Sequence, residues 1–349
     1  MIKKLLFGFV LLISLVSSYS YTNISTCTTI DDTFISNNGG FREFRMNDSV
    51  EYTTGDNCMI LNADNIVFDC NTNSIYRSSY GGSGTAFETF TSGSNITVQN
   101  CSINNIAEAL YANSADSTYD NFEINFSTIR IFASRNSTFS NFTFPAGYMN
   151  IVRCNYCTFE NMYFDLSLVN YGIQIGSFGA TNATFSNIFM ENGLESGIIY
   201  DGNEPGGNTF FKDIIINNVT DPLKISHGSS NLIVDNLTTT NSNRSIYFDS
   251  SFGFLMDIQN ISIVNSNLGN FSDVYIETSS NYNLSNISIS YDSFNIETIP
   301  DPPCFPPVEL GICLEIPVIG QPSQSLFPIQ SSSFLIILLS ILGIFFSLS

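Results

Sequence analysis

The stretch Phe139-Ser140-Asn141-Phe142-Thr143-Phe144 decides the fold that this sequence predicts. One apolar residue stands two positions before a central Asn, and two more stand one and three positions after it. Twenty residues later the same order returns as Phe159-Glu160-Asn161-Met162-Tyr163-Phe164. The alternation after the Asn has the period of a β-strand that buries one side.

The same six-residue pattern occurs ten times between residues 63 and 289. Its central residues are Asn65, Asn100, Asn121, Asn141, Asn161, Asn187, Asp213, Asn236, Asn260 and Asn286. The first two are 35 residues apart, which we interpret as a longer loop, and the later ones are 20 to 26 residues apart. A sustained period of this length predicts a solenoid in which each repeat forms one coil.

The central Asn identifies the kind of solenoid. It lies between two inward-facing residues, so the chain must bend sharply there, and Asn adopts the left-handed backbone conformation more readily than most residues. In stacked coils each Asn amide would hydrogen-bond the next. A second short strand follows about ten residues later, as in residues 172–175 and 245–248. We therefore predict an all-β, right-handed parallel β-helix of about nine to ten coils.

The two ends of the chain predict export and attachment to the cell surface. Lys3 and Lys4 precede an apolar run at residues 5–16, so we interpret residues 1–20 as a signal peptide. We expect an N-terminal cap at 21–60, the repeats at 61–297 and a stalk at 298–330, which holds eight of the eleven prolines. Residues 331–349 are a hydrophobic anchor, read either as a GPI-type attachment signal or as a retained membrane helix.

Composition excludes some partners. The formal net charge is −20, so we expect neither nucleic acid nor an anionic membrane surface to bind the body of the protein. Charged residues make up only 12% of the chain, so Asn, Ser and Thr must supply much of its solubility. We expect N-glycosylation, although the repeat itself accounts for part of the excess of sequons. The candidate sites are Asn23, Asn47, Asn95, Asn100, Asn125, Asn136, Asn141, Asn182, Asn218, Asn236, Asn243, Asn260, Asn270, Asn283 and Asn286.

Eight cysteines in an exported chain predict disulfides. Cys154 and Cys157 are close enough for a tight turn to join them, and we expect Cys304 to pair with Cys313. Four more, which we expect to pair among themselves near the cap, are Cys27, Cys58, Cys70 and Cys101. A zinc site at the Cys154-x-x-Cys157 motif is disfavoured, because this motif and a single histidine do not fill four ligand positions.

Residues 58–61, 65–71 and 95–103 resemble the opening coils of the pectate-lyase-like β-helix superfamily. They are most similar to its carbohydrate-binding and sugar-hydrolase repeats, including NosD-like surface proteins. The resemblance covers about residues 27–297 and implies the fold. It implies function only broadly, because the superfamily contains lyases, hydrolases, epimerases and non-catalytic adhesins.

A column of residues beyond the second strands is the candidate site. It comprises Gly176, Asp201, Ser226, Asp249 and Glu277, with His227 beside Ser226. Coils about 4.8 Å apart would bring its acids and the histidine within reach of one sugar. Ser226-His227-Gly228 resembles the Gly-His-Gly motif of polygalacturonases, but the Asn-Thr-Asp, Asp-Asp and Arg-Ile-Lys motifs of that family are missing. The alternative is a hydrated face where Asp201, Asp249 and Glu277 hold calcium loosely.

The sequence thus favours a non-catalytic cell-surface protein that serves adhesion or carbohydrate binding. Its partner would be a carbohydrate or another cell-surface molecule, with the membrane reached only through the C-terminal tail. No cofactor is expected other than calcium. The alternative is a polysaccharide lyase or glycoside hydrolase, with Asp201, His227, Asp249 and Glu277 as candidate catalytic residues.

Overall fold

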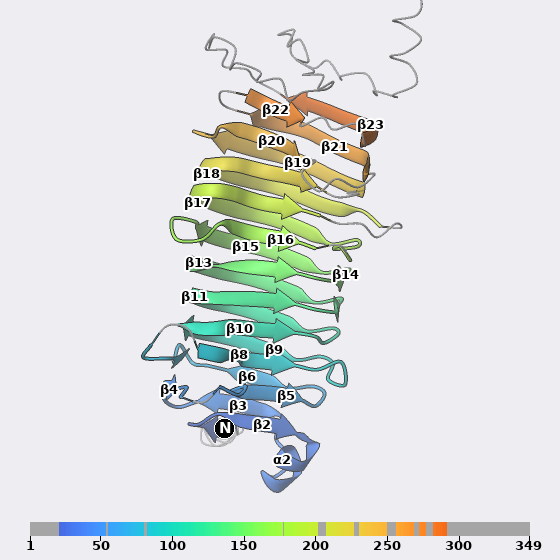
Figure 1. The fold of residues 1–349 in the computed structure, drawn as a ribbon. Helices are drawn as coiled ribbons and strands as arrows, with labels where there is room; N and C mark the ends of the chain where they lie inside the picture. Colours follow the sequence, from blue (N-terminus) through green and yellow to red (C-terminus); the bar gives the residue numbers. More distant parts are fainter. Residues whose placement is uncertain are drawn as a thin grey trace, which may run out of the picture.

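Short strands stack one above another along a single axis, from the N-terminal coil at one end to β23 at the other (Figure 1). This computed structural model describes residues 21–53, 55–79, 82–176, 178–201, 207–226, 230–249, 256–268, 272–276 and 282–291. The predicted signal peptide, stalk and C-terminal anchor lie outside these residues. Within them, no helix is long and apolar enough to cross a membrane.

Twenty-three strands and one short helix make up the described part of the chain. The first half contains β1 (Thr22–Ile24), β2 (Thr28–Asp31), α2 (Asp32–Asn37), β3 (Glu43–Met46), β4 (Val50–Glu51), β5 (Met59–Asn62), β6 (Val67–Asp69), β7 (Ser74–Tyr76), β8 (Gly82–Thr89), β9 (Thr97–Asn104), β10 (Ile106–Ala112) and β11 (Thr118–Ile131). The second half contains β12 (Ser134–Arg135), β13 (Thr138–Ile151), β14 (Cys154–Asn155), β15 (Thr158–Asp165), β16 (Tyr171–Ile175), β17 (Thr184–Tyr200), β18 (Thr209–Ser226), β19 (Ser230–Thr240), β20 (Arg244–Asp249), β21 (Met256–Leu268), β22 (Ser272–Ile276) and β23 (Tyr282–Tyr291).

The pairing of these strands is parallel, and each strand pairs with its equivalent one coil further along. β11 lies between β9 and β13, for example, and β17 lies between β15 and β18. The coils form a right-handed β-helix of about nine turns, as the repeat predicts. Long strands such as β11 bend at two corners, so each contributes to three faces of the coil.

Inward-facing aromatic rings fill the core, because the same inward position recurs in successive coils. Rings at one such position stack from coil to coil with centroids 4.4–4.9 Å apart. These residues are Tyr119, Phe139, Phe159, Phe185 and Phe211. A second stack, Phe144 on Phe164, has a centroid separation of 4.2 Å. Each large ring buries extensive apolar surface, so these stacks dominate the hydrophobic stabilisation of the helix.

The predicted Asn corners are confirmed. Asn100, Asn121, Asn141, Asn161 and Asn187 all have φ between 54° and 59°, and they align from coil to coil. Asn121 Nδ2 donates to Asn100 Oδ1 over 2.8 Å, and Asn161 donates to Asn141 over 3.3 Å. The ladder is not uniform, since Asn141 donates instead to Asp120 Oδ1, 2.7 Å away. A carboxylate or an amide oxygen of the neighbouring coil can therefore accept the hydrogen bond from the Asn side chain.

The first repeat is in a different register from the one that the sequence pattern predicts. Val67 pairs with Thr97, which places Asn65 beside Asn95 and not beside Asn100. Asn95 Nδ2 accordingly donates to Asn65 Oδ1 over 2.8 Å. The interval of 35 residues therefore joins two different corners of the coil. The coil from Asn65 to Asn95 spans 30 residues, still more than the 20 to 26 of the later repeats, so the longer loop accounts for part of the interval.

The solenoid also begins earlier than the predicted boundary at residue 61. β1 pairs in parallel with β3, and β2 pairs with β5, so residues 22–62 already form coils. α2 is the cap-like element at this end (Figure 1). Asp31 begins the helix, because its Oδ1 accepts a hydrogen bond of 2.7 Å from the Phe34 amide.

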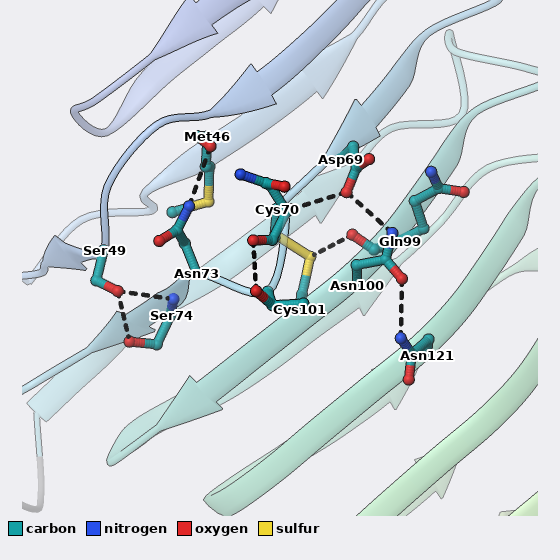
Figure 2. The surroundings of a disulfide bond; sticks show 12 residues. Met46, Ser49, Asp69, Cys70, Asn73, Ser74, Gln99, Asn100, Cys101 and Asn121 are labelled. Atoms are coloured by element: carbon teal, nitrogen blue, oxygen red, sulfur yellow. Dashed lines mark hydrogen bonds between the residues drawn. A yellow bond between two sulfur atoms is a disulfide. The ribbon is translucent and has the colours of Figure 1, made fainter.

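Three disulfides join the six cysteines in the described part of the chain. Cys27 pairs with Cys58, Cys70 with Cys101, and Cys154 with Cys157, as expected of cysteines near the cap and in the tight turn. Figure 2 shows that Cys70–Cys101 links two successive coils beside the ladder formed by Asp69, Asn100 and Asn121. The predicted pair of Cys304 and Cys313 lies outside the described residues.

Candidate functional site

The strand predicted second in each repeat, as at residues 172–175 and 245–248, is the third strand of its coil. These third strands form one continuous side of the molecule, called here the third face. In coil order, it comprises β8, β10, the C-terminal parts of β11 and β13, β16, the C-terminal parts of β17 and β18, and β20. Because side chains alternate along a strand, one outward position per coil forms a column on this face. The column contains Glu88, Tyr111, Arg130, Asn150, Gln174, Ile199, Lys224 and Tyr247.

Aromatic side chains gather on the N-terminal half of this face. Tyr111 stacks on Phe132 with ring centroids 5.8 Å apart and planes 22° apart. Tyr148 meets Tyr171 edge to face, with centroids 4.8 Å apart. Burial, and next the neighbouring Tyr148, raise the pKa of Tyr171 well above the ordinary value of 10. Burial also raises the pKa of Tyr111, so both phenols remain neutral hydroxyl groups at neutral pH.

A cavity of about 450 Å³ adjoins these tyrosines, at the corner that precedes the third face. Apolar and small residues line most of it, and Tyr148 forms part of the wall. The lining residues are Ser83, Asn105, Ile106, Ala107, Phe126, Ser127, Thr128, Ala146, Gly147, Tyr148, Leu168 and Val169. A concave, largely apolar site with a few hydroxyl and amide groups is typical of small-molecule and sugar binding.

Phe126 stands in an unfavourable backbone conformation beside this cavity. Its φ is 50°, a left-handed value that is costly for a bulky residue, and its side chain is 40% exposed. In the preceding coil the same corner is occupied by Asn105, with φ 60°. Backbone strain of this kind is common at functional sites, where a side chain is retained despite its cost.

The predicted acidic column is assembled as expected in its described part. Ile175 pairs with Tyr200 and Tyr200 with Ile225, which stacks Gly176, Asp201 and Ser226. Ser226 pairs with Asp249. His227 and Glu277 lie outside the described residues.

Asp249 is not on a hydrated face, and this part of the prediction was wrong. Its side chain is 1% exposed, and its Oδ2 lies 2.6 Å from Lys224 Nζ. The Tyr247 hydroxyl donates a hydrogen bond of 3.3 Å to Asp249 Oδ1. A second ion pair lies three residues before Lys224 and Tyr247 on the same two strands, where Arg244 binds both oxygens of Asp221 at 2.5–2.6 Å.

Tyr247 links the two ion pairs. The Arg244 guanidinium carbon lies 3.8 Å from the centre of the Tyr247 ring, and Lys224 Nζ lies 5.5 Å from it. Cations over a ring face are attracted by its negative quadrupole. The ring and the two ion pairs therefore form one cluster, called here the Tyr247 cluster, of Tyr247, Lys224, Asp249, Arg244 and Asp221. The charges of its two acids and two bases cancel.

The geometry gives little support to catalysis by the acidic column. Asp201 and Asp249 are separated by the intervening coil of Ser226, about 10 Å apart along the axis at 4.8 Å per coil. A catalytic pair of carboxyls must divide the roles of acid and base, whereas Asp249 is held in a close ion pair, 2.6 Å from Lys224 Nζ. Among the described residues no three acidic, His or Cys side chains group as metal ligands, and calcium binding stays a prediction.

The sequence reasoning missed the cavity and its aromatic wall, although a signal was present. In five coils a second Asn stands five residues after the ladder residue, as in Asn100 and Asn105, and four of these have a positive φ: Asn105, Asn192, Asn218 and Asn241. The coil of Asn121 has Phe126 at that position. The two following coils have Ala146 and Leu166 at that position, so Phe126 is the residue that keeps the left-handed corner without an Asn.

Comparison with solved structures agrees with the β-helix fold. No protein-family model matches the sequence, and no curated protein does so. A similar solved structure is the catalytic domain of a GH87 α-1,3-glucanase in complex with nigerose, with a TM-score of 0.50, 12% identity and coverage of 76% of this chain. The match spans 58% of the glucanase chain. An alginate lyase from Paenibacillus sp. str. FPU-7 gives a TM-score of 0.38 and 11% identity, covering 66% of this chain and 93% of the lyase.

Proposed function

We propose that this protein, a β-helix of the pectate-lyase-like fold, is a non-catalytic cell-surface protein that binds carbohydrate along its third face. The observation that carries the proposal is the row of aromatic side chains on successive coils, together with the adjoining cavity. Sugar rings present apolar C–H surfaces and hydroxyl edges. Tyrosine offers a matching apolar ring and a hydroxyl group on the same side chain.

The direction of the third face suits a polymeric ligand. Outward side chains repeat once per coil, about 4.8 Å apart along the axis, so a chain lying along the axis would meet similar groups at regular intervals. The glucanase that shares the fold is described in complex with nigerose, a sugar. The shared fold and this bound sugar together support carbohydrate as the ligand class here.

Substitution of Tyr148 tests the proposal. Tyr148→Ala removes one wall of the cavity and the partner of Tyr171, and we expect binding to weaken about tenfold, the effect of losing one aromatic contact. Affinity electrophoresis in gels that contain soluble polysaccharides measures the change. Tyr163→Ala is the matched control, because Tyr163 lies on β15, away from the third face, and bonds Glu191 over 2.7 Å.

A sugar-release screen separates binding from catalysis. We expect the purified protein to release no oligosaccharide from any polysaccharide that it binds, with or without calcium. Release that disappears in Asp201→Asn would establish the alternative, a glycoside hydrolase or polysaccharide lyase. Equal binding of polysaccharide by wild type, Tyr148→Ala and Tyr163→Ala would instead show that the third face is not the binding site.

A further inference from the structure

Basic residues on the third face are already paired with acids of the same face. Lys224 pairs with Asp249 at 2.6 Å, and Arg244 holds Asp221 with two hydrogen bonds. Arg130 Nη1 lies 3.5 Å from Glu108 Oε1. These three are the Lys and Arg residues in the described part of the outward columns, and each has an acidic partner on the same face.

The acid partners are positioned to hold these cations. Asp221 is 7% exposed and Asp249 is 1% exposed, so a ligand carboxylate cannot displace them without leaving a buried charge uncompensated. Glu88 lies on the same face and accepts a hydrogen bond from the neutral amide of Asn57. The face is therefore neutral to acidic, in a chain whose formal net charge is −20.

We infer that the ligand of the third face is an uncharged polysaccharide and not a uronate polymer. The inference rests on the proposed carbohydrate binding and names its substrate class. A uronate chain carries a carboxylate on each sugar, and each would lose hydration against this face without gaining a cation. A neutral chain needs only apolar contact and hydroxyl partners, which the neutral tyrosines and the amides Asn150 and Gln174 supply.

Binding to neutral and acidic polymers tests this inference directly. Affinity electrophoresis of the full chain would compare gels that contain laminarin or dextran with gels that contain polygalacturonate or alginate. We expect retardation by a neutral glucan, unchanged between low and high salt, and none by the uronates. Retardation by uronates that equals or exceeds that by glucans overturns the inference but leaves carbohydrate binding intact. Retardation by none of the four polymers overturns both.

A variant that removes the acid partner of one arginine provides a second test. Asp221→Asn is nearly isosteric and removes the carboxylate from Arg244, while the guanidinium keeps its contact with the Tyr247 ring. The Arg244 guanidinium then faces a neutral amide in place of that carboxylate, and a guanidinium is well suited to bind a ligand carboxylate. We expect Asp221→Asn to gain retardation by polygalacturonate that is lost at high salt.

Glu123→Gln is the matched control for this variant. It changes the net charge by the same amount, but Glu123 is exposed on the second strand of its coil, away from the third face. It should gain no affinity for polygalacturonate. An equal gain of affinity for polygalacturonate in both variants would show that overall charge excludes uronates. It would overturn a role for the ion pairs of this face.

Discussion

At the corners of the coil the backbone is left-handed, and this conformation is strained for most residue types. Most residues with positive φ are Asn or Asp, whose short polar side chains tolerate this conformation. Phe126 and Tyr156 are aromatic exceptions, 40% and 57% exposed. Phe126 lines the cavity, whereas Tyr156 lies between the two cysteines of the Cys154–Cys157 disulfide. The two residues carry similar strain, but only Phe126 adjoins the proposed site.

Replacing Phe126 should therefore improve stability and impair binding. Phe126→Asn relieves a conformational cost of about 1–2 kcal/mol, against a smaller loss of packing because the ring is partly exposed. We expect the free energy of unfolding to rise and carbohydrate affinity to fall, measured by denaturant unfolding and affinity electrophoresis. The protein should be made in a host that adds no N-glycans, since the change creates a sequon.

Tyr156→Asn is the control for this substitution. It relieves the same kind of strain at a different corner, so stability should rise while binding stays unchanged. Wild-type affinity in Phe126→Asn would place Phe126 outside the site. A loss of stability in both variants would contradict the assignment of strain to these corners.

At the scale of one coil, a disulfide and a hydrogen bond fill equivalent positions. Ser134 pairs with Cys154, and Ser114 occupies the same position one coil earlier. Ser114 Oγ donates to Ser117 Oγ over 2.9 Å across the corner that Cys154 and Cys157 close covalently. The fold thus tolerates either solution at this corner.

The disulfides should differ in their contribution to stability. The double variant Cys154→Ser/Cys157→Ser should still fold, with a loss of about 2 kcal/mol or less, since the closed loop is short. Cys70→Ser/Cys101→Ser opens a bridge between residues 31 apart and should cost about 3–4 kcal/mol. Denaturant unfolding under non-reducing conditions measures both. A larger loss in the first variant would contradict the equivalence of the Ser and Cys corners.

At the scale of the whole molecule, stability accumulates coil by coil. Each coil contacts its neighbours through parallel strands, side-chain ladders and stacked rings, so the long third face is rigid without a separate scaffold. A face of this length, held by one continuous core, can present several sugar-binding positions in a fixed row.

Surface attachment is a prediction at this scale. Deletion of Phe334–Ser349 should release folded protein into the medium, because the apolar tail is the segment that we expect to hold the chain at the membrane. Cell fractionation followed by immunoblotting measures the distribution. A truncated protein that stays with the membrane fraction would show that another segment, or a partner, attaches it.

The amino-acid sequence by itself determined the period, the inward positions, the Asn corners and the cysteines available for pairing. These features are local, because each depends on alternation and backbone preference within one repeat. It also placed Asp201, Ser226 and Asp249 in one column, since the repeats there have similar lengths.

The tertiary structure alone decided the register of the first repeat, the burial of Asp249 and the cavity beside Phe126. Asn65 was matched to the wrong corner because two corners of a coil use the same residue type, and only pairing across coils distinguishes them. Asp249 was expected in water, but Lys224 comes from the adjacent coil, 25 residues earlier in the chain. Contacts between coils depend on how many residues each loop adds, so the site could be assembled only in three dimensions.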